Sequence, residues 1–253
     1  MSWSPAAHYS LRNIPGNIAC NCVVNRTSVR FFPGGIYVKF VLVLNSPEMQ
    51  IDKLAQIAAQ ARVIAVDGGL RHLDQLGIAP EWIVGDLDSV TPDLLNRHKS
   101  SKLIKVPVEK DFTDLELALE LVKRTSCKEL IVFGVSGGLR FDHQLLNFRA
   151  LLRYAGKGRR VRLVGRQNFV FSRRSQCLLS SRGRNFSVLA IDHPVVISIN
   201  GSKYSGKRIR LLPDSGFGMG NRITEKMARI KVHSGFAAIC QWEDEDEHQD
   251  SDN

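Results

Sequence analysis

Acidic side chains are absent from the start of this 253-residue chain: the first is Glu48, so residues 1–37 carry no negative charge. Their arginines, serines and asparagines have the composition of a transit peptide, but no clear amphipathic helix accompanies them. The strand-like run Val38–Asn45 that follows is typical of the start of an α/β domain. We therefore expect residues 1–37 to be a disordered or artefactual extension, with a targeting signal as the alternative.

Long apolar runs are also missing. The longest, Phe40–Leu44, is far shorter than the ~20 residues of a membrane-spanning helix, so we expect no membrane span. The five cysteines are odd in number and scattered, and Cys20 and Cys22 lack the spacing of a zinc knuckle. These features predict a reduced, cytoplasmic protein.

Negative charge is scarce outside the C-terminus. Residues 243–253 hold 7 of the 25 acidic side chains, so residues 1–242 carry 35 basic against 18 acidic groups, a net charge of +17. Such a charge favours polyanionic partners, either nucleotide phosphates or nucleic acid, although solubility alone explains it equally well. We interpret residues 243–253 as a solvated acidic tail.

Hydrophobic periodicity predicts two domains. Over residues 38–157, short apolar runs alternate with amphipathic segments, which predicts an α/β domain with a parallel sheet. Over residues 160–242, short apolar or alternating runs follow one another with glycines and polar turns between them, which predicts an all-β sandwich. Two helix starts are marked: Ser46 as an N-cap followed by proline, and Thr113 with Glu116 as a capping box.

Four acidic and glycine-containing motifs follow predicted strands of the first domain. They are Asp67-Gly68-Gly69, Gly85-Asp86-Leu87-Asp88-Ser89, Asp111-Phe112-Thr113-Asp114 and Arg140-Phe141-Asp142-His143. The carboxyl ends of parallel strands form the ligand-binding crevice of an open α/β sheet. Carboxylates that converge there repel one another unless a cation lies between them, and Mg²⁺ prefers oxygen ligands and accompanies phosphates. The sequence therefore predicts a metal- and nucleotide-dependent enzyme.

Each motif also has a simpler explanation. Asp67-Gly68-Gly69 is compatible with a tight turn, and Thr113 and Asp114 with helix capping. Asp86 and Asp88 can face one cation while Leu87 turns into the core, and Asp111 is not explained by capping.

The last motif is equally open. Asp142 can cap a helix on which His143 and Asn147 share a face, and the guanidinium of Arg140 suits a phosphate.

Together the motifs resemble those of the thiamine pyrophosphokinase (thiamine diphosphokinase) family. The matching segments are Val66-Asp67-Gly68-Gly69, Gly85–Ser89, Asp111–Asp114, and Gly137–His143 with Asn147, and the resemblance covers residues 38 to about 155. It implies Mg²⁺-dependent transfer of a diphosphoryl group from ATP to the hydroxyl of thiamine, with release of AMP. It also implies a homodimer with active sites shared between subunits.

The resemblance is weaker in the second domain, where the family binds thiamine from the partner subunit. Its two segments stand here as Gly201-Ser202-Lys203-Tyr204 and Gly218-Met219-Gly220-Asn221, so Tyr204 and Asn221 match while Gly220 replaces a serine. Leu139 also interrupts the fourth motif between Gly138 and Arg140. We expect thiamine to contact Tyr204, Gly220 and Asn221, with Tyr204 stacking on its cationic ring.

The resemblance and the chemistry of the motifs lead to a set of expected roles. The expected Mg²⁺ ligands are Asp67, Asp86, Asp88 and Asp111, the expected catalytic groups are Asp88, Asp111 and Asp114, and the expected ATP-binding residues are Gly68, Gly69, Ser89, Thr113, Arg140, Asp142, His143 and Asn147. Either Asp88 or Asp114 can serve as the acid–base group.

Three other functions stay open. A pyrophosphokinase that acts on another hydroxymethyl heterocycle, such as a pterin, has the same ATP motifs. A nucleic-acid-binding protein accounts for the positive charge, but the chain has no interleaved aromatic and basic residues. A catalytically silent thiamine sensor fits poorly with an intact set of acidic residues.

Overall fold

The computed structural model describes residues 38–107, 109, 111–156, 159–173, 176–180 and 182–242. The predicted extension 1–37, the acidic tail 243–253, and Lys157 and Gly158 at the predicted domain boundary lie outside this part. The chain divides into two compact units: unit 1 ends at Leu151 and unit 2 begins at Leu152. Among the described residues, no helix has the length and apolar character needed to cross a membrane.

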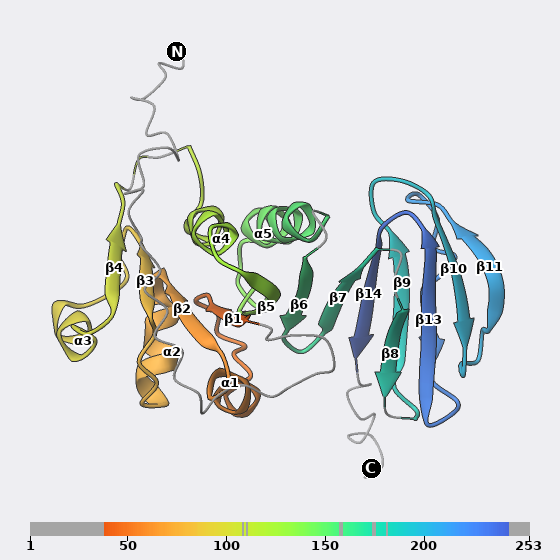
Figure 1. Ribbon diagram of the computed structural model, residues 1–253, viewed down its shortest axis with the longest axis horizontal. Helices are drawn as coiled ribbons and strands as arrows, with labels where there is room; N and C mark the ends of the chain where they lie inside the picture. The colour runs from red at the N-terminus through yellow and green to blue at the C-terminus, as the bar shows by residue number, and fades with distance from the viewer. Residues whose placement is uncertain are drawn as a thin grey trace, which may run out of the picture. The chain divides into compact units, whose positions relative to one another are not determined.

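Unit 1 is built on five strands in the order β5-β1-β2-β3-β4 (Figure 1). All neighbouring pairs in this sheet are parallel. The strands are β1 Val38–Val43, β2 Arg62–Val66, β3 Trp82–Gly85, β4 Lys102–Lys105 and β5 Cys127–Phe133. Phe40–Val43 of β1 and Leu130–Phe133 of β5 are buried, as a parallel sheet covered on both faces requires.

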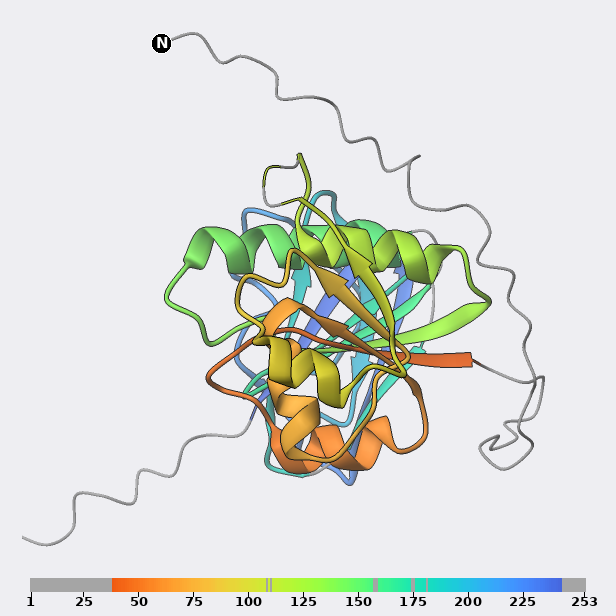
Figure 2. The ribbon, with the colours of Figure 1, turned by 90° about the vertical axis from the view of Figure 1, so that its left-hand side faces the viewer.

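Helices connect the strands and cover both faces of this sheet. In Figures 1 and 2, α4 lies on one face and α1 and α2 lie on the other. The helices are α1 Ile51–Ala58, α2 Leu70–Gln75, α3 Pro92–Arg97, α4 Asp114–Lys123 and α5 Phe141–Ala155. Every connection between parallel strands therefore has a helix or a helical turn available to bury the sheet.

One of the two predicted helix starts is confirmed, since Thr113 and Glu116 form the complete capping box. Thr91 caps α3 with Pro92 at its first position, a helix start that was not predicted. The expected N-cap Ser46 was wrong: α1 begins at Ile51 after Gln50. The Ser46 hydroxyl instead accepts a hydrogen bond from the Glu48 amide and donates one to the Ser136 carbonyl.

Unit 2 consists of antiparallel strands arranged as a sandwich. One layer has the order β12-β9-β14-β7-β6 and the other the order β11-β10-β13-β8. The strands are β6 Arg160–Val164, β7 Asn168–Ser172, β8 Gln176–Ser180, β9 Asn185–Ala190, β10 Val195–Asn200, β11 Gly206–Leu211, β12 Asn221–Arg222, β13 Met227–Ser234 and β14 Ala237–Trp242. The predicted combination of a parallel α/β unit with an all-β sandwich is confirmed.

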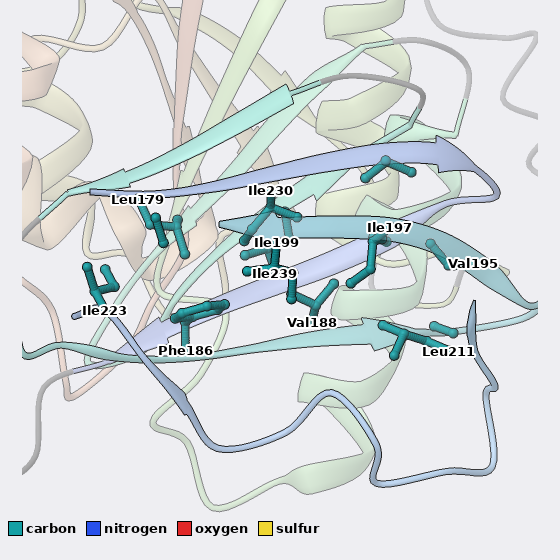
Figure 3. Packing of buried hydrophobic residues seen from close by; sticks show 14 residues of the cluster. Leu179, Phe186, Val188, Val195, Ile197, Ile199, Leu211, Ile223, Ile230 and Ile239 are labelled. Atoms are coloured by element: carbon teal, nitrogen blue, oxygen red, sulfur yellow. The ribbon is translucent and has the colours of Figure 1, made fainter. Parts of the chain in front are cut away.

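Apolar side chains between these layers form the core of unit 2. Figure 3 draws these side chains as sticks and labels most of them, including Phe186, Ile197, Ile230 and Ile239, and all four are buried. They alternate with less buried residues along β10 and β13, the period expected of strands with one buried face. The sequence missed only the two-residue strand β12 in this unit, because two residues carry no period.

Candidate active site

The strand order of unit 1 creates a crevice between β1 and β5. The chain proceeds from β1 through β2 and β3 to β4 on one side, then returns through α4 to β5 on the other side of β1. When the connections from two neighbouring strands run in opposite directions, a crevice forms at the carboxyl ends of those strands. This crevice is where α/β proteins bind ligands. Leu44 and Asn45 after β1, and residues 134–136 after β5, line a cleft of about 520 Å³ there.

Several predicted residues lie in this cleft. Asp67, Thr113, Asp114, Arg140, His143 and Asn147 all contribute to its lining, with Phe112, Leu139 and Gln144 between them. These residues come from the ends of β2 and β5, the start of α4 and the first turns of α5. The fold therefore collects residues from three of the four motifs at one place.

A group of three carboxylates lies at the ends of β2 and β3. Asp67, Asp86 and Asp88 each offer one carboxylate oxygen, and the three oxygens lie within 4.8 Å of one another. Asp67 and Asp86 are partly buried and Asp88 is exposed. Asp67 also lines the cleft, so it joins the carboxylate group to the cleft.

Asp67 is held in an unusual conformation. Its φ of 47° is in the left-handed region, which is uncommon for a residue with a side chain. Its Oδ2 accepts a hydrogen bond of 2.9 Å from the Ser89 hydroxyl, whereas Oδ1 is buried and has no hydrogen-bond partner among the described residues. A buried carboxylate oxygen in this condition suits a cation.

The loop after β3 presents its two acids on one side. Leu87 between them has a φ of 64° and is buried, as its predicted inward turn requires. The Asp88 amide donates to Asp86 Oδ1 at 3.2 Å, and the Arg71 guanidinium donates to the Ser89 carbonyl oxygen. The loop is therefore tied both to itself and to α2.

The two glycines after Asp67 are required by packing. A Cβ atom on Gly69 would lie 1.9 Å from the Val43 carbonyl oxygen, and one on Gly68 would lie 2.9 Å from the side chains of Asn45 and Ser89. Both glycines are buried in the short helical turn that precedes α2. Close approach between this turn and β1 thus brings Asp67 to the mouth of the crevice.

The residues of the third motif do not all lie at the same place. Thr113 caps α4 through the Glu116 amide at 3.2 Å, and Asp114 follows in the first turn. Both line the cleft, whereas Asp111 is exposed and belongs neither to the cleft lining nor to the carboxylate group. The metal role expected for Asp111 stays a prediction.

The fourth motif forms an internal ion pair. Arg140 donates through Nε to Asp142 Oδ1 at 3.2 Å, and its terminal nitrogen pairs with Oδ2. The hydrogen bonds from Arg140 lower the pKa of Asp142 to about 2. His143 and Asn147, one turn apart on α5, both face the cleft.

Sequence reasoning missed the residues that support this loop. The side-chain amide of Gln144 donates to the Gly138 carbonyl at 2.6 Å, and the Ser46 hydroxyl donates to the Ser136 carbonyl at 2.6 Å. Asn45 lines the cleft at the end of β1. Its position directly after a buried central strand was the available signal.

The three residues expected to contact thiamine lie together in unit 2. The Asn221 side chain accepts from the Tyr204 amide at 3.0 Å and donates to the Tyr204 carbonyl at 2.9 Å, so both ends of its amide hold the loop at Tyr204. Asn221 is buried, whereas the Tyr204 ring is 57% exposed. Gly220 has a φ of 66°, and a Cβ there would meet no atom within 4 Å.

The donor set at the carboxylate group fits a hard divalent cation. Three carboxylates from two adjacent loops supply only oxygen, the ligand type that Mg²⁺ prefers, and Asp67 Oδ1 lacks another partner. Mg²⁺ takes ligands at about 2.0–2.1 Å and usually keeps positions for phosphate or water. Asp67, Asp86 and Asp88 are therefore the residues that would hold it.

Comparisons with known proteins agree on one family. Residues 54–163 match the family model described as thiamin pyrophosphokinase, catalytic domain. Over 109 residues the chain is 36% identical to the thiamine pyrophosphokinase of Bacillus subtilis, a match that spans 42% of this chain and 50% of that protein. The match thus covers about half the length of the curated relative.

Solved structures extend the likeness of fold to both units. The crystal structure of the Bacillus subtilis thiamine pyrophosphokinase has a TM-score of 0.73 at 21% identity, covering 81% of this chain and 99% of that one. The Geobacillus thermodenitrificans enzyme gives 0.70 at 21% identity, covering 82% and 99%. The Candida albicans enzyme gives 0.64 at 17% identity, covering 82% and 90%.

Proposed function

Because this chain carries, over residues 54–163, a catalytic domain of the thiamine pyrophosphokinase family, we propose that it transfers the diphosphoryl group of ATP to the hydroxyl of thiamine. The products are thiamine diphosphate and AMP, and the reaction depends on Mg²⁺. The observation that carries the proposal is the position of Asp67, which belongs both to the carboxylate group and to the cleft.

In this proposal the carboxylate group and the cleft have different roles. Asp67, Asp86 and Asp88 would hold Mg²⁺, which would supply neutralisation of phosphate charge when bound. Thr113 and Arg140 in the cleft orient the triphosphate, with the guanidinium of Arg140 exchanging part of its contact with Asp142 for phosphate.

The acid–base role falls to Asp114 in this arrangement. Asp88 is in the carboxylate group and is needed as a ligand, whereas Asp114 lines the cleft beside Thr113. A carboxylate within reach of the attacking hydroxyl can accept its proton as the bond to phosphorus forms. Asp114→Asn should lower kcat while leaving the KM for ATP nearly unchanged.

A homodimer is part of the proposal. Large apolar side chains are exposed in both units: Leu139, Phe141, Leu145 and Leu146 in unit 1, and Leu212, Phe217 and Met219 in unit 2. Exposed apolar patches of this kind mark interaction surfaces. Light scattering after size-exclusion chromatography should give twice the mass of the 28.3 kDa chain.

The proposal also includes a reduced, cytoplasmic setting. It is supported by Cys127 and Cys240, which are buried free thiols.

The decisive experiment measures AMP release from ATP and Mg²⁺ with and without thiamine, and follows thiamine diphosphate by fluorescence after oxidation. Thiamine-dependent AMP in equal amount to thiamine diphosphate is the expected result. ATP binding without turnover of thiamine would instead favour another hydroxymethyl heterocycle as acceptor. The open space at Gly220 would then be the first place to examine.

A further inference from the structure

The outer face of the four-stranded layer β11-β10-β13-β8 is strongly basic. Apolar residues of β10, β11 and β13 point into the core of unit 2, as Figure 3 shows for Ile197, Ile199 and Ile230. The residues that alternate with them face away from the core. Five exposed cations of β11 and β13 form what we call the basic face: Lys207, Arg208, Arg210, Arg229 and Lys231. Lys207 and Arg208 are neighbours at the irregularity in the pairing of β10 with β11, where Arg208 has a φ of 51°.

Strand pairing brings these cations close together. Arg229 lies opposite Asn200 and Lys231 opposite Ser198, while the Arg208 amide donates to the Ser198 hydroxyl at 3.0 Å. Arg210 lies opposite Val196 on the other side of β10. The five cations therefore lie on β11 and β13, the two strands on either side of β10, which are about 10 Å apart.

Nothing on this layer balances the charge. The strands β8, β10, β11 and β13 contain no Asp or Glu, and none of the five cations forms an ion pair with a described residue. Over residues 152–242 the chain has 18 basic and 3 acidic side chains, a net charge of +15. A cluster of this kind attracts a polyanion.

The chemistry of the face favours carboxylates over nucleic acid bases. None of its four strands carries a Phe, Tyr or Trp, so bases have no ring to stack on. The chain itself supplies a complementary segment, since residues 243–247 are Glu-Asp-Glu-Asp-Glu, followed by Asp250 and Asp252.

This acidic run follows β14, which belongs to the other layer of the sandwich. The Gln241 side chain of β14 donates to the Ser180 carbonyl oxygen of β8 at 2.9 Å, so the end of β14 lies beside an edge of the four-stranded layer. Ser180 ends β8, the edge strand, and pairs with Met227, two residues before Arg229. The ten residues 243–252 can span about 33 Å when extended, which exceeds the ~10 Å between two layers and the ~14 Å across four strands taken together.

We propose that the acidic segment 243–252 binds the basic face of its own chain. The contact places alternating Glu and Asp side chains over Arg229, Lys231 and the cations of β11. It neutralises about half of the excess charge of residues 152–242 and competes with other polyanions for this surface. Because the pairs are exposed, the contact weakens as salt shortens the screening length from ~10 Å at 0.1 M.

Zero-length cross-linking tests the contact directly in the full chain. A carbodiimide joins a carboxylate to an amine with loss of water, and mass spectrometry identifies the linked residues. At low salt, Lys231 and Lys207 should be joined to residues 243–247, and this product should disappear above ~0.5 M NaCl. Mixing isotopically labelled and unlabelled protein separates links within one chain from links between two copies. Links to Lys99 and Lys128 of unit 1 at equal yield would overturn the proposal.

A binding experiment tests the same idea with matched variants. The probe is a fluorescein-labelled ten-residue polyglutamate peptide, and full-length protein is titrated at low salt. Changing the acids at 243–247 to Gln and Asn should tighten probe binding about tenfold. Adding Arg210→Gln, Arg229→Gln and Lys231→Gln should abolish that gain.

The control carries the same change in charge elsewhere. Adding Lys99→Gln, Lys128→Gln and Arg160→Gln to the neutralised tail should leave most of the gain in place, since these three exposed residues lie off the basic face. Unfolding curves confirm that every variant is folded. An unchanged affinity after tail neutralisation, or an equal loss in the control, would contradict binding of the tail to this face.

Discussion

The two units of this protein use charge in opposite ways. Residues 1–151 hold 17 basic and 15 acidic side chains, whereas residues 152–242 hold 18 basic and 3 acidic ones. In unit 1 the acids gather at strand ends, and three of them lie within 4.8 Å of one another despite their mutual repulsion. In unit 2 the cations occupy the outer positions of regular strands. Like charges held close together on loops indicate a site for a small ligand or ion. Like charges at the outward positions of regular strands indicate an extended charged surface.

Both units contain strained or closely packed backbone, including Arg208 at a φ of 51° in unit 2, but in unit 1 it lies beside the carboxylate group. Asp67 and Leu87 of unit 1 adopt left-handed conformations beside the carboxylate group, and buried glycines let the turn after β2 approach β1. Such strain is sustained only where surrounding structure fixes it, as at ligand sites. The core of unit 2 depends mainly on alternation of apolar side chains between two layers.

Asp67→Asn should have the largest effect. Loss of one carboxylate charge weakens the cation site and changes the cleft at once, so we expect kcat/KM to fall about a thousandfold, measured as thiamine-dependent AMP release. Asp214→Asn, the same change at an exposed position of unit 2, should leave activity within about twofold. Equal activity of both variants would show that the carboxylate group does not serve the reaction.

Gly69→Ala should lower the free energy of unfolding by about 3 kcal/mol, because its Cβ would lie 1.9 Å from the Val43 carbonyl. Gly220→Ser in unit 2 meets open space and costs only the left-handed backbone conformation, about 1 kcal/mol. Urea unfolding followed by circular dichroism measures both. If Gly220→Ser were the more damaging change, the contrast between a packed turn in unit 1 and an open turn in unit 2 would be wrong.

Thr113→Ala and Thr91→Ala remove equivalent N-caps, and each should cost about 1 kcal/mol of stability. Only Thr113 lines the cleft, so only its loss should raise the KM for ATP, by about fivefold. Steady-state kinetics with varied ATP, beside thermal unfolding of both variants, separates binding from stability. A matching rise in KM for Thr91→Ala would place the effect in helix stability alone.

Asp74→Asn should have the smallest effect, and one that depends on pH. Hydrogen bonds from Arg97 lower the pKa of Asp74 to about 2 in the folded protein, below the ordinary value of 3.8. The stability this carboxylate adds is therefore present above pH ~4 and is lost as the pH falls toward 2. Solvent screens the pair, so its contribution stays below about 1 kcal/mol. The gap in melting temperature between the variant and the parent chain should stay constant from pH 7 to about pH 5 and narrow as the pH falls through 4 toward 2, and a gap that does not narrow would exclude this linkage.

Most elements of the fold were predictable because local patterns carried them. The capping box at Thr113, the proline at the first position of α3, and the apolar runs of β1 and β5 each specify an element through neighbouring residues. Ser46 failed as a cap because its hydroxyl bonds to Ser136, 90 residues away in sequence, which no local pattern reveals. Gln144 and Asn45 were missed for the same reason, since their roles depend on the loop between β5 and α5 and on the crevice.

The sequence by itself determined the types and order of the secondary structure elements, the chemistry of the motifs and the uneven distribution of charge. Periodicity and residue type act over a few neighbouring positions, so they can be recognised in the sequence without knowledge of the fold. Only the tertiary structure decided that Asp67 joins the carboxylate group to the cleft, that Asp111 lies outside both, and that Arg140 is paired with Asp142. Those outcomes depend on strand order and on contacts across the chain, which arise only when the sheet assembles.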